Sequence, residues 1–317
     1  MKTKKFKICS LFAGIGGFEL GFKGFDVVYA NEIDKYACRT YRMNFPNTHL
    51  DECDVCNVDC SDIPDFDVLT AGFPCQTFSS VGLQQGFNDK RGTMFFEILR
   101  FLKQKKPKAI LLENVSNLLK HDNGNTFSVI KSSLENLGYS IKYEVMNALD
   151  YGIPQQRNRI FIVGFLDNTK TEHFVFPKHI KLRHDAFYFL DKIKQPDSYY
   201  MTRHKRWDEI NSHVVDNRKI YRFTDWGFSS GKAGICPTLL AAMGSQFERI
   251  PFFRDEFSIR KLTQRECARL QGIPDSYKFD MKAPKQVYKQ IGNSVCVNIV
   301  SLLAKEIKKQ LLEVFYE

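Results

Sequence analysis

The stretch from residue 8 to residue 17 most constrains how this chain can fold. Ile8 to Phe12 form a short apolar run that reads as a buried strand, and a turn containing Gly14, Gly16 and Gly17 follows at once. A strand, a glycine turn and the start of a helix direct backbone N–H groups and the helix dipole at a ligand. The stretch therefore predicts an α/β fold with a nucleotide-type site at the end of its first strand.

The rest of the first half continues this pattern of apolar runs and helical periods. A glycine at position 138 is expected to stop the second of two predicted helices. Together these elements make a complete α/β unit. The predicted strands cover 27–32, 67–72, 109–112, 141–145 and 160–165, and the predicted helices cover 95–102 and 125–137.

An acidic residue, Glu32, ends the second predicted strand. A carboxylate at this place, after a glycine turn, is suited to bind ribose hydroxyls. The pattern fits a nicotinamide dinucleotide and S-adenosylmethionine equally, and a solvated carboxylate at a strand end is the plain alternative.

Two groups suited to chemistry follow other predicted strands. Cys75 comes after the apolar run 68–71 and a turn with Gly72 and Pro74. Glu113 ends the run 109–112, so it should lie near Cys75 if the two strands are neighbours. A lone cysteine is more often a small buried apolar residue. Burial at the strand end would raise the pKa of Glu113 and let it serve as an acid.

Further along, two segments have both a functional and a plain interpretation. The loop 76–92 has three glycines and few large apolar residues, which suits a mobile lid or an ordinary surface loop. Arg157 and Arg159 precede the strand 160–165, and alternation should turn both to one side. They suit phosphate contacts or a solvated edge.

His49, Cys53, Cys56 and Cys60 form a compact cluster. Zinc sites of this kind need a second well-spaced pair of ligands, so free thiols and no metal are expected. Nine cysteines without a secretory signal indicate a reducing cytoplasm. No stretch is long and apolar enough to span a membrane.

The second half of the chain is more basic. The net charge is +10, which suggests a polyanionic partner. After Pro177 basic and aromatic residues interleave, as suits backbone contacts to nucleic acid, although a basic surface over a small core is also possible. We expect one domain of residues 1–178 plus 288–317 and another of 179–287.

Two stretches near the C-terminus have clear local signals. Thr263 and Glu266 form a capping box, and Gly272 should stop that helix. Residues 290–295 are expected to open the last helix, with Gly292 and Asn293 as its turn and cap.

Six stretches in order resemble the motifs of the cytosine-5 DNA methyltransferases. The most specific are Gly72-Phe73-Pro74-Cys75-Gln76, Glu113-Asn114-Val115, the Gln-x-Arg-x-Arg stretch 155–159 and the Gln-x-Gly-Asn-Ser stretch 290–294. The resemblance implies a Rossmann-like sheet of S-adenosylmethionine-dependent methyltransferases with a second, smaller target-recognition domain.

The resemblance also implies which residues bind S-adenosylmethionine. Phe12 would stack near the adenine, Glu32 would hold the ribose, Ile33 would pack on the base and Asp54 would bind the adenine amino group. The full implied set is Phe12, Ala13, Gly14, Ile15, Gly16, Gly17, Asn31, Glu32, Ile33, Asp54, Val55, Gly72, Pro74, Asn293, Ser294 and Val295.

By the same resemblance, the reaction takes place on a cytosine flipped out of duplex DNA. Cys75 would attack ring carbon 6 as a thiolate, and Glu113 would hydrogen-bond ring nitrogen 3. Arg159 would hold the ring oxygen and Arg157 would orient the neighbouring carboxylate. The loop 76–92 would close over the base.

The short variable region resembles that of small prokaryotic restriction–modification enzymes. It implies a monomer in the cytoplasm, associated with the nucleoid, and a separate cognate restriction endonuclease. The residues expected to contact DNA are Gln76, Ser79, Arg91, Arg203, Arg206, Arg222 and Thr238.

Three other functions remain open on the sequence. One is cytosine-5 methylation of transfer RNA, since a branch of the family acts there. Another is a dehydrogenase on the same kind of sheet, which leaves Cys75 and Glu113 unexplained. The third is a DNA-binding regulator that is catalytically inert.

Overall fold

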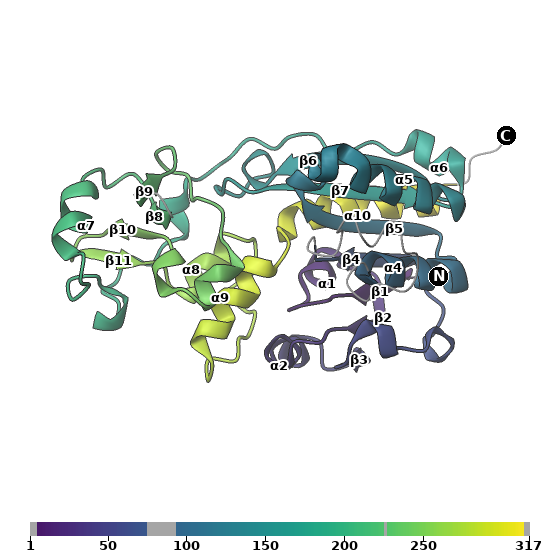
Figure 1. The fold of residues 1–317 in the computed structure, drawn as a ribbon, viewed down its shortest axis with the longest axis horizontal. Coiled ribbons are helices and arrows are strands. Elements are labelled where there is room, and N and C mark those ends of the chain that lie inside the picture. The colour runs from purple at the N-terminus through teal and green to yellow at the C-terminus, as the bar shows by residue number, and fades with distance from the viewer. Residues whose placement is uncertain (1–4, 75–92, 225–226, 314–317) are drawn as a thin grey trace. The chain divides into compact units, whose positions relative to one another are not determined.

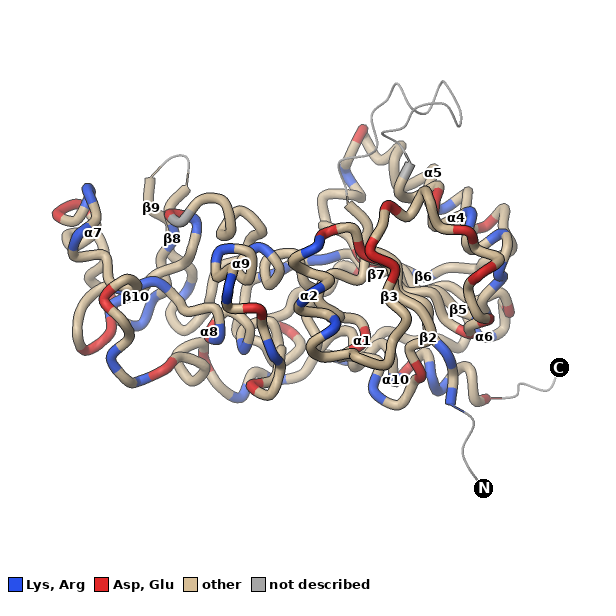
Figure 2. The backbone as a smooth tube through the Cα atoms, turned by 90° about the horizontal axis from the view of Figure 1, so that it is seen from below, with Lys and Arg blue, Asp and Glu red and all other residues tan. Residues whose placement is uncertain are grey.

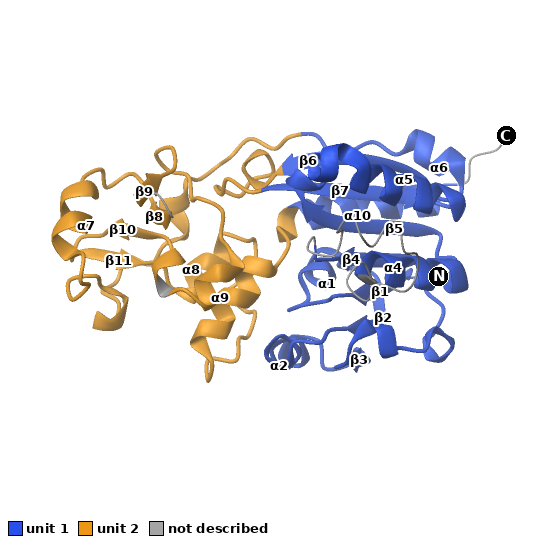
Figure 3. Ribbon diagram, viewed as in Figure 1, with its two compact units in different colours: residues 1–146, 158–178, 299–317 blue, residues 147–157, 179–298 orange. Residues whose placement is uncertain are grey.

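The computed structural model describes residues 5–74, 93–224 and 227–313. The chain divides into two compact units, coloured separately in Figure 3. Unit 1 comprises 1–146, 158–178 and 299–317, and unit 2 comprises 147–157 and 179–298. Each unit is built around a sheet of its own.

Unit 1 contains a seven-stranded sheet in the order β3-β2-β1-β4-β5-β7-β6 (Figure 1). β1, β2, β3, β4 and β5 run parallel, and β7 pairs antiparallel with β5. This is the α/β sheet that the sequence predicts. The strands are β1 Lys7–Leu11, β2 Asp26–Asn31, β3 Leu50–Asp51, β4 Val68–Gly72, β5 Ala109–Val115, β6 Ser140–Asn147 and β7 Asn158–Phe165.

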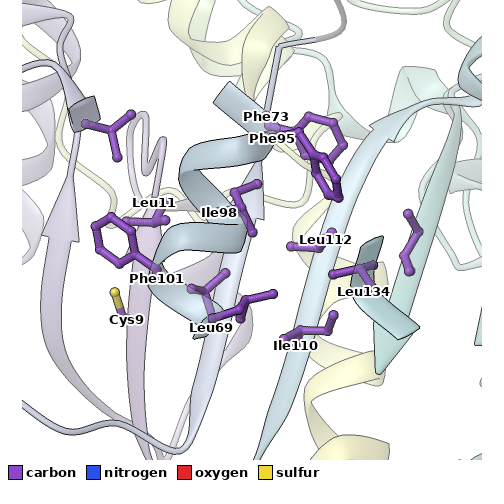
Figure 4. Packing of buried hydrophobic residues seen from close by; sticks show 14 of the residues in the cluster. Cys9, Leu11, Leu69, Phe73, Phe95, Ile98, Phe101, Ile110, Leu112 and Leu134 are labelled. Carbon is purple, nitrogen blue, oxygen red and sulfur yellow. The ribbon is translucent and has the colours of Figure 1, made fainter. Parts of the chain in front are cut away.

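Apolar helix faces bury the sheet of unit 1. Ile98 and Phe101 of one helix, α4, pack with Leu69, Ile110 and Leu112 of the central strands (Figure 4). The central strands are apolar on both faces because helices cover both sides of a parallel sheet. The helices of this unit are α1 Gly17–Gly21, α2 Lys35–Asn44, α4 Thr93–Lys105, α5 Asn125–Asn136, α6 Asn168–His173 and most of α10 Val297–Leu312.

Unit 2 holds a small antiparallel sheet in the order β11-β10-β8-β9. Its core joins Phe223 and Phe252 of the sheet to Ile210 of α7. The second, smaller sheet domain is thus present as predicted. Its elements are β8 Tyr221–Thr224, β9 Gly227–Ser230, β10 Phe252–Arg254, β11 Ile259–Lys261, α7 Trp207–His213, α8 Gln264–Arg269 and α9 Pro284–Asn293.

The division into units differs from the expected domains in two segments. Residues 147–157 and 288–298 both belong to unit 2. The reason is local packing: the Gln155 side chain donates to the Leu270 carbonyl at 2.6 Å, and Tyr288 donates to the Leu262 carbonyl at 2.6 Å. Both segments are therefore packed into unit 2.

The prediction that residues 290–295 open the last helix is wrong. This stretch ends α9, and α10 begins at Val297. Gly292 is neither a turn nor a cap but a buried helical residue: a Cβ there would lie 2.2 Å from the carbonyl carbon of Leu240. The glycine is needed because another backbone crosses the helix at this point.

Several local predictions are confirmed. Thr263 and Glu266 form the complete capping box at the start of α8, and Gly138 and Gly272 adopt the left-handed conformation just after α5 and α8. Such glycines end helices because they lack a Cβ.

Charge is unevenly distributed along the chain. The segment 50–67 contains acidic residues and no Lys or Arg, and red marks it around β3 in Figure 2, whereas both signs occur around α7. Within residues 5–74, 93–224 and 227–313, no helix is long and apolar enough to cross a lipid bilayer.

Candidate active site

One edge of the unit 1 sheet collects most of the predicted site residues. Phe12 follows β1, Glu32 follows β2, and Gly72 and Glu113 lie in the last part of β4 and β5. Because these strands are parallel, their carboxyl ends meet at the same edge of the sheet. That edge is where open α/β sheets bind ligands.

The glycine turn and Glu32 are joined by hydrogen bonds. Gly14 N donates to Glu32 Oε2 at 2.8 Å. The other carboxylate oxygen accepts from the backbone N–H groups of Ile33 and Asp34, at 2.9 and 2.8 Å. Burial raises the pKa of Glu32, while these donors oppose the rise. The carboxylate is thereby held in one orientation at the strand end.

The turn itself has a backbone that favours small residues. Phe12 and Gly14 have positive φ values of 54° and 57°, and a Cβ on Gly14 would meet nothing within 4 Å. Open space beside the Cα of Gly14 suits close approach of a ligand. Gly16 is different, because a Cβ there would collide with the ring of Phe45 at 2.2 Å.

Ile33, Asp54 and Val55 are the other predicted adenosine contacts. The Ile33 side chain is 65% exposed, so it offers an apolar surface to a base. Asp54 caps a short 3₁₀ turn by accepting from Cys56 N at 3.0 Å, and Val55 is buried. A carboxylate for ribose, an apolar surface for a base and open backbone at Gly14 fit the nucleoside of S-adenosylmethionine.

The remaining residues of this group support the backbone. The buried Asn31 amide donates to the Cys53 carbonyl at 3.0 Å, and Ala13 N donates to the Asn31 carbonyl at 3.0 Å. Ile15 and Gly17 are buried at the start of α1. These buried residues and backbone hydrogen bonds stabilise the conformation of the glycine turn.

β4 and β5 are neighbours in the sheet. This is the condition under which Glu113 was expected to lie near the end of the strand that leads to Cys75. Gly72 lies opposite Glu113 in the register. The Asn114 amide donates to the Phe73 carbonyl at 3.0 Å, which ties the turn after β4 to β5. Asn114 had no predicted role, although its place directly after Glu113 at a strand end was a usable signal.

Glu113 is paired with Arg159. Arg159 Nε lies 3.1 Å from Glu113 Oε1, and both side chains are largely buried. Arg159 is on β7, where it pairs with Val115 of β5. The antiparallel pairing of these two strands therefore brings a guanidinium to the carboxylate.

Arg157 has different surroundings. It precedes β7 and belongs to unit 2. Its guanidinium donates to the Leu239 carbonyl at 2.8 Å. It also donates to the carbonyls of Gly292 and Ser294, at 3.1 and 2.7 Å.

Four predicted residues lie outside the described residues, as does the proposed lid 76–92. They are Cys75, Gln76, Ser79 and Arg91. Pro74, which is exposed, is the last described residue before them.

The expected DNA contacts in unit 2 have varied surroundings. Arg206 forms two hydrogen bonds to Glu209, at 2.7 and 2.6 Å, and its guanidinium stacks on Phe223 and Phe228. The Thr238 hydroxyl donates to the Gln156 carbonyl.

Other predicted residues of unit 2 are spread along its surface and core. Arg203 is exposed and Arg222 is half-buried. Among the residues at the end of α9, Asn293 is exposed whereas Ser294 and Val295 are buried.

The cysteine cluster has no metal-binding geometry in the described part of the chain. Cys53, Cys56 and Cys60 are free thiols. Cys60 Sγ accepts a hydrogen bond from Arg100 at 3.1 Å, and the His49 imidazole lies 2.9 Å from Asp51. The cluster is therefore divided among separate polar partners.

Comparison with known proteins gives a consistent result over nearly the full chain. Residues 6–309 match the family model described as C-5 cytosine-specific DNA methylase. The chain is 44% identical over 316 residues to Type II methyltransferase M.Bsp6I of Bacillus sp. (strain RFL6), covering 96% of this chain and 99% of the relative. It is 41% identical over 327 residues to Type II methyltransferase M.HhaI of Haemophilus parahaemolyticus, covering 96% and 95%.

Solved structures share the fold. The Dnmt2 methyltransferase of S. pombe superposes with a TM-score of 0.75 at 20% identity, covering 98% of this chain and 100% of that one. A putative DNA modification methyltransferase encoded within an E. coli prophage gives a TM-score of 0.74 at 24% identity, with the same coverage.

Proposed function

Because the chain belongs to the C-5 cytosine-specific DNA methylase family, we propose a division of labour among its residues. The protein is a DNA cytosine-5 methyltransferase that uses S-adenosylmethionine. The proposal concerns which side chains bind the cofactor, which carry the reaction and which part contacts DNA.

In the proposed mechanism, Cys75 attacks ring carbon 6 of a cytosine that has left the duplex stack. Glu113 hydrogen-bonds ring nitrogen 3 and stabilises the electron-rich ring. Bound S-adenosylmethionine supplies the methyl group for carbon 5. A base from solvent takes the proton on carbon 5, the double bond between carbons 5 and 6 re-forms, and the bond from carbon 6 to Cys75 breaks, which releases Cys75 as a thiolate.

The observation that carries this proposal is the pairing of Gly72 with Glu113. The turn that leads to Cys75 starts beside the carboxyl of Glu113, and Asn114 fixes that turn through the Phe73 carbonyl. A nucleophile and an acid on neighbouring strand ends can reach one ring together.

The two arginines take different parts. Arg159 holds Glu113 in place and reaches the oxygen of the cytosine ring, since its guanidinium has several donors. Arg157 is a positioning residue: it joins the carbonyl groups of residues 239, 292 and 294 inside unit 2. It therefore supports the backbone of the proposed recognition unit.

We assign the cofactor to the edge formed by the glycine turn, Glu32, Ile33, Asp54 and Gly72. Glu32 would accept from the ribose hydroxyls while it keeps its bond to Gly14. Ile33 would cover one face of the adenine. Asn293, Ser294 and Val295 are proposed to add contacts from the end of α9.

Unit 2 is the proposed target-recognition domain for double-stranded DNA. Arg203 and Arg222 are its proposed contacts, together with Arg206 once its pairing with Glu209 opens. The relatives are named Type II methyltransferases, so we assign the protein to a restriction–modification system with a separate endonuclease. We propose that it acts as a monomer in the cytoplasm, on DNA of the nucleoid.

Transfer of a labelled methyl group from S-adenosylmethionine to duplex DNA tests the activity, with transfer RNA in parallel. Bisulfite sequencing then identifies the modified cytosines. We expect label in DNA at cytosines that share one short sequence. Label in transfer RNA alone would reject the DNA assignment, and label in neither would support an inert DNA-binding regulator.

The nucleophile is tested with Cys75→Ala. We expect this variant to lose methyl transfer and to retain binding of S-adenosylmethionine, because the thiol contributes to the covalent step alone. Wild-type turnover by Cys75→Ala would remove Cys75 from the mechanism. Cys267→Ala, at a free thiol on α8 of unit 2, is the matched control and should keep methyl transfer.

A further inference from the structure

Glu19 is a buried carboxyl for which the proposed mechanism has no use. It lies on α1, three residues after Gly16, and is 5% exposed. Tyr41 Oη donates to Glu19 Oε1 at 3.0 Å. Within the described part of the chain, no Lys or Arg is among the groups that act on this carboxyl. A buried carboxylate without a cation is costly, so the neutral acid is favoured.

The second carboxyl oxygen faces the hydroxyl of Ser10. Glu19 Oε2 and Ser10 Oγ are both buried, and neither has a partner of hydrogen-bond geometry among the described residues. The Ser10 and Tyr41 hydroxyls both lower the pKa of Glu19, but burial outweighs them. Burial raises the pKa of Glu19 to about 7.

Glu19 connects the elements that frame the glycine turn. Ser10 is on β1, just before the turn, and Tyr41 is on α2. The same helix α2 is followed by Phe45, whose ring fills the space beside Gly16. The carboxyl of Glu19 therefore links both sides of the turn to the short helix that follows it.

We propose that Glu19 is a positioning residue for the cofactor: its neutral form holds the glycine turn in the shape that binds S-adenosylmethionine, and its ionisation weakens that binding. The inference rests on the proposed cofactor site. An ionised Glu19 would draw water into the space between β1, α1 and α2 and displace the turn.

Other groups near Glu19 do not titrate in the same way. Tyr41 faces it from α2 and Cys9 from β1, where burial raises the pKa of the Cys9 thiol well above its ordinary value. From α10, Val300 and Ser301 approach α1 at Gly21, and neither carries a charge.

The test is calorimetric binding of S-adenosylhomocysteine and of 5′-methylthioadenosine to the full chain between pH 6 and pH 9. The second probe lacks the α-amino and carboxyl groups of S-adenosylhomocysteine and does not itself titrate between pH 6 and pH 9, so the pH dependence of its binding reports on the protein. For the wild type we expect affinity to fall above about pH 7, by at most about tenfold per pH unit. Glu19→Gln keeps a neutral group of the same shape, so it should bind like the wild type at pH 6 and show no fall.

Two further variants make the test specific. Tyr41→Phe removes a hydroxyl that lowers the pKa of Glu19, so the fall should move to higher pH. Glu135→Gln changes an exposed carboxyl on α5 and should keep the wild-type profile. Identical profiles for wild type and Glu19→Gln, or no shift in Tyr41→Phe, overturn the inference. No binding by the wild type at any pH contradicts the proposed cofactor site instead.

Discussion

Gly72 and Glu113 lie opposite each other on adjacent parallel strands, and Glu113 Oε2 is 3.4 Å from where a Cβ on Gly72 would be. The absence of a side chain at Gly72 leaves room for the carboxyl at the sheet edge. The lack of a side chain at Gly72 thus determines where the carboxyl of Glu113 can lie. Gly72 also begins the turn that leads to Cys75.

Substitution of Gly72 should therefore affect catalysis in proportion to size. Gly72→Ala adds a methyl group at ordinary contact distance, so we expect stability within about 1 kcal/mol of the wild type. Gly72→Val adds two further methyl groups that press on Glu113, and a displacement of about 1 Å can cost about 10²-fold in rate. Single-turnover methylation and thermal unfolding measure the two effects. Equal rates for both variants would contradict the relationship.

The pairing of Glu113 with Arg159 predicts that the methylation rate depends on the geometry of the guanidinium as well as on its charge. Glu113→Gln should lower the methylation rate by about 10²–10⁴-fold, the usual contribution of a positioned acid or base. Arg159→Lys keeps the charge but loses the planar fork of donors, so it should retain only part of the rate. Single-turnover rates with S-adenosylmethionine at saturation measure both, and full activity of Arg159→Lys would reject a geometric role for the guanidinium.

Gly292→Ala should destabilise unit 2. Its Cβ would collide with the backbone of Leu240 and Ala241, which cannot move aside as a flexible side chain would. We expect a loss of about 1–3 kcal/mol in the free energy of unfolding, the usual cost of overpacking. Lys285→Ala, at an exposed position on the same helix, is the control and should stay within about 0.5 kcal/mol. Similar denaturation midpoints for the two variants would argue against the close crossing.

Lys261 predicts that unit 2 becomes more stable as the pH rises above 7. Burial lowers the pKa of Lys261 from 10.5 to about 7. Between these values the unfolded chain binds a proton that the folded unit does not, so the free energy of unfolding increases with pH. Lys261→Met removes the proton site. Thermal unfolding between pH 7 and pH 9 should show a rising midpoint for the wild type and a smaller rise for Lys261→Met, and parallel curves would exclude Lys261 as the cause.

The sheet and its active edge were predictable because their signals are local. Apolar runs that end in Gly72 or Glu113 indicate strands whose polar ends lie at one edge. The register of β4 and β5 was not predictable, since no local pattern states which strands are neighbours. The structure gives this register, in which Gly72 of β4 lies opposite Glu113 of β5.

The partners of Arg157 and the surroundings of Gly292 were not predictable for a related reason. Both are understood only through a segment far away in the sequence, around Leu239 and Leu240. Spacing along a strand or helix cannot reveal contacts between segments separated by tens of residues. Glu19 was passed over for the same reason, because its partner Tyr41 is on another helix.

The partners of Arg157 in unit 2 are main-chain carbonyls, and so is one partner of Gln155, the oxygen of Leu270. Hydrogen bonds to main-chain carbonyls do not depend on which side chains the accepting residues carry. Substitutions on the surface of unit 2 would therefore leave these backbone contacts in place. If unit 2 is the target-recognition domain, as proposed, a change of its DNA site in evolution would require the exchange of surface residues only.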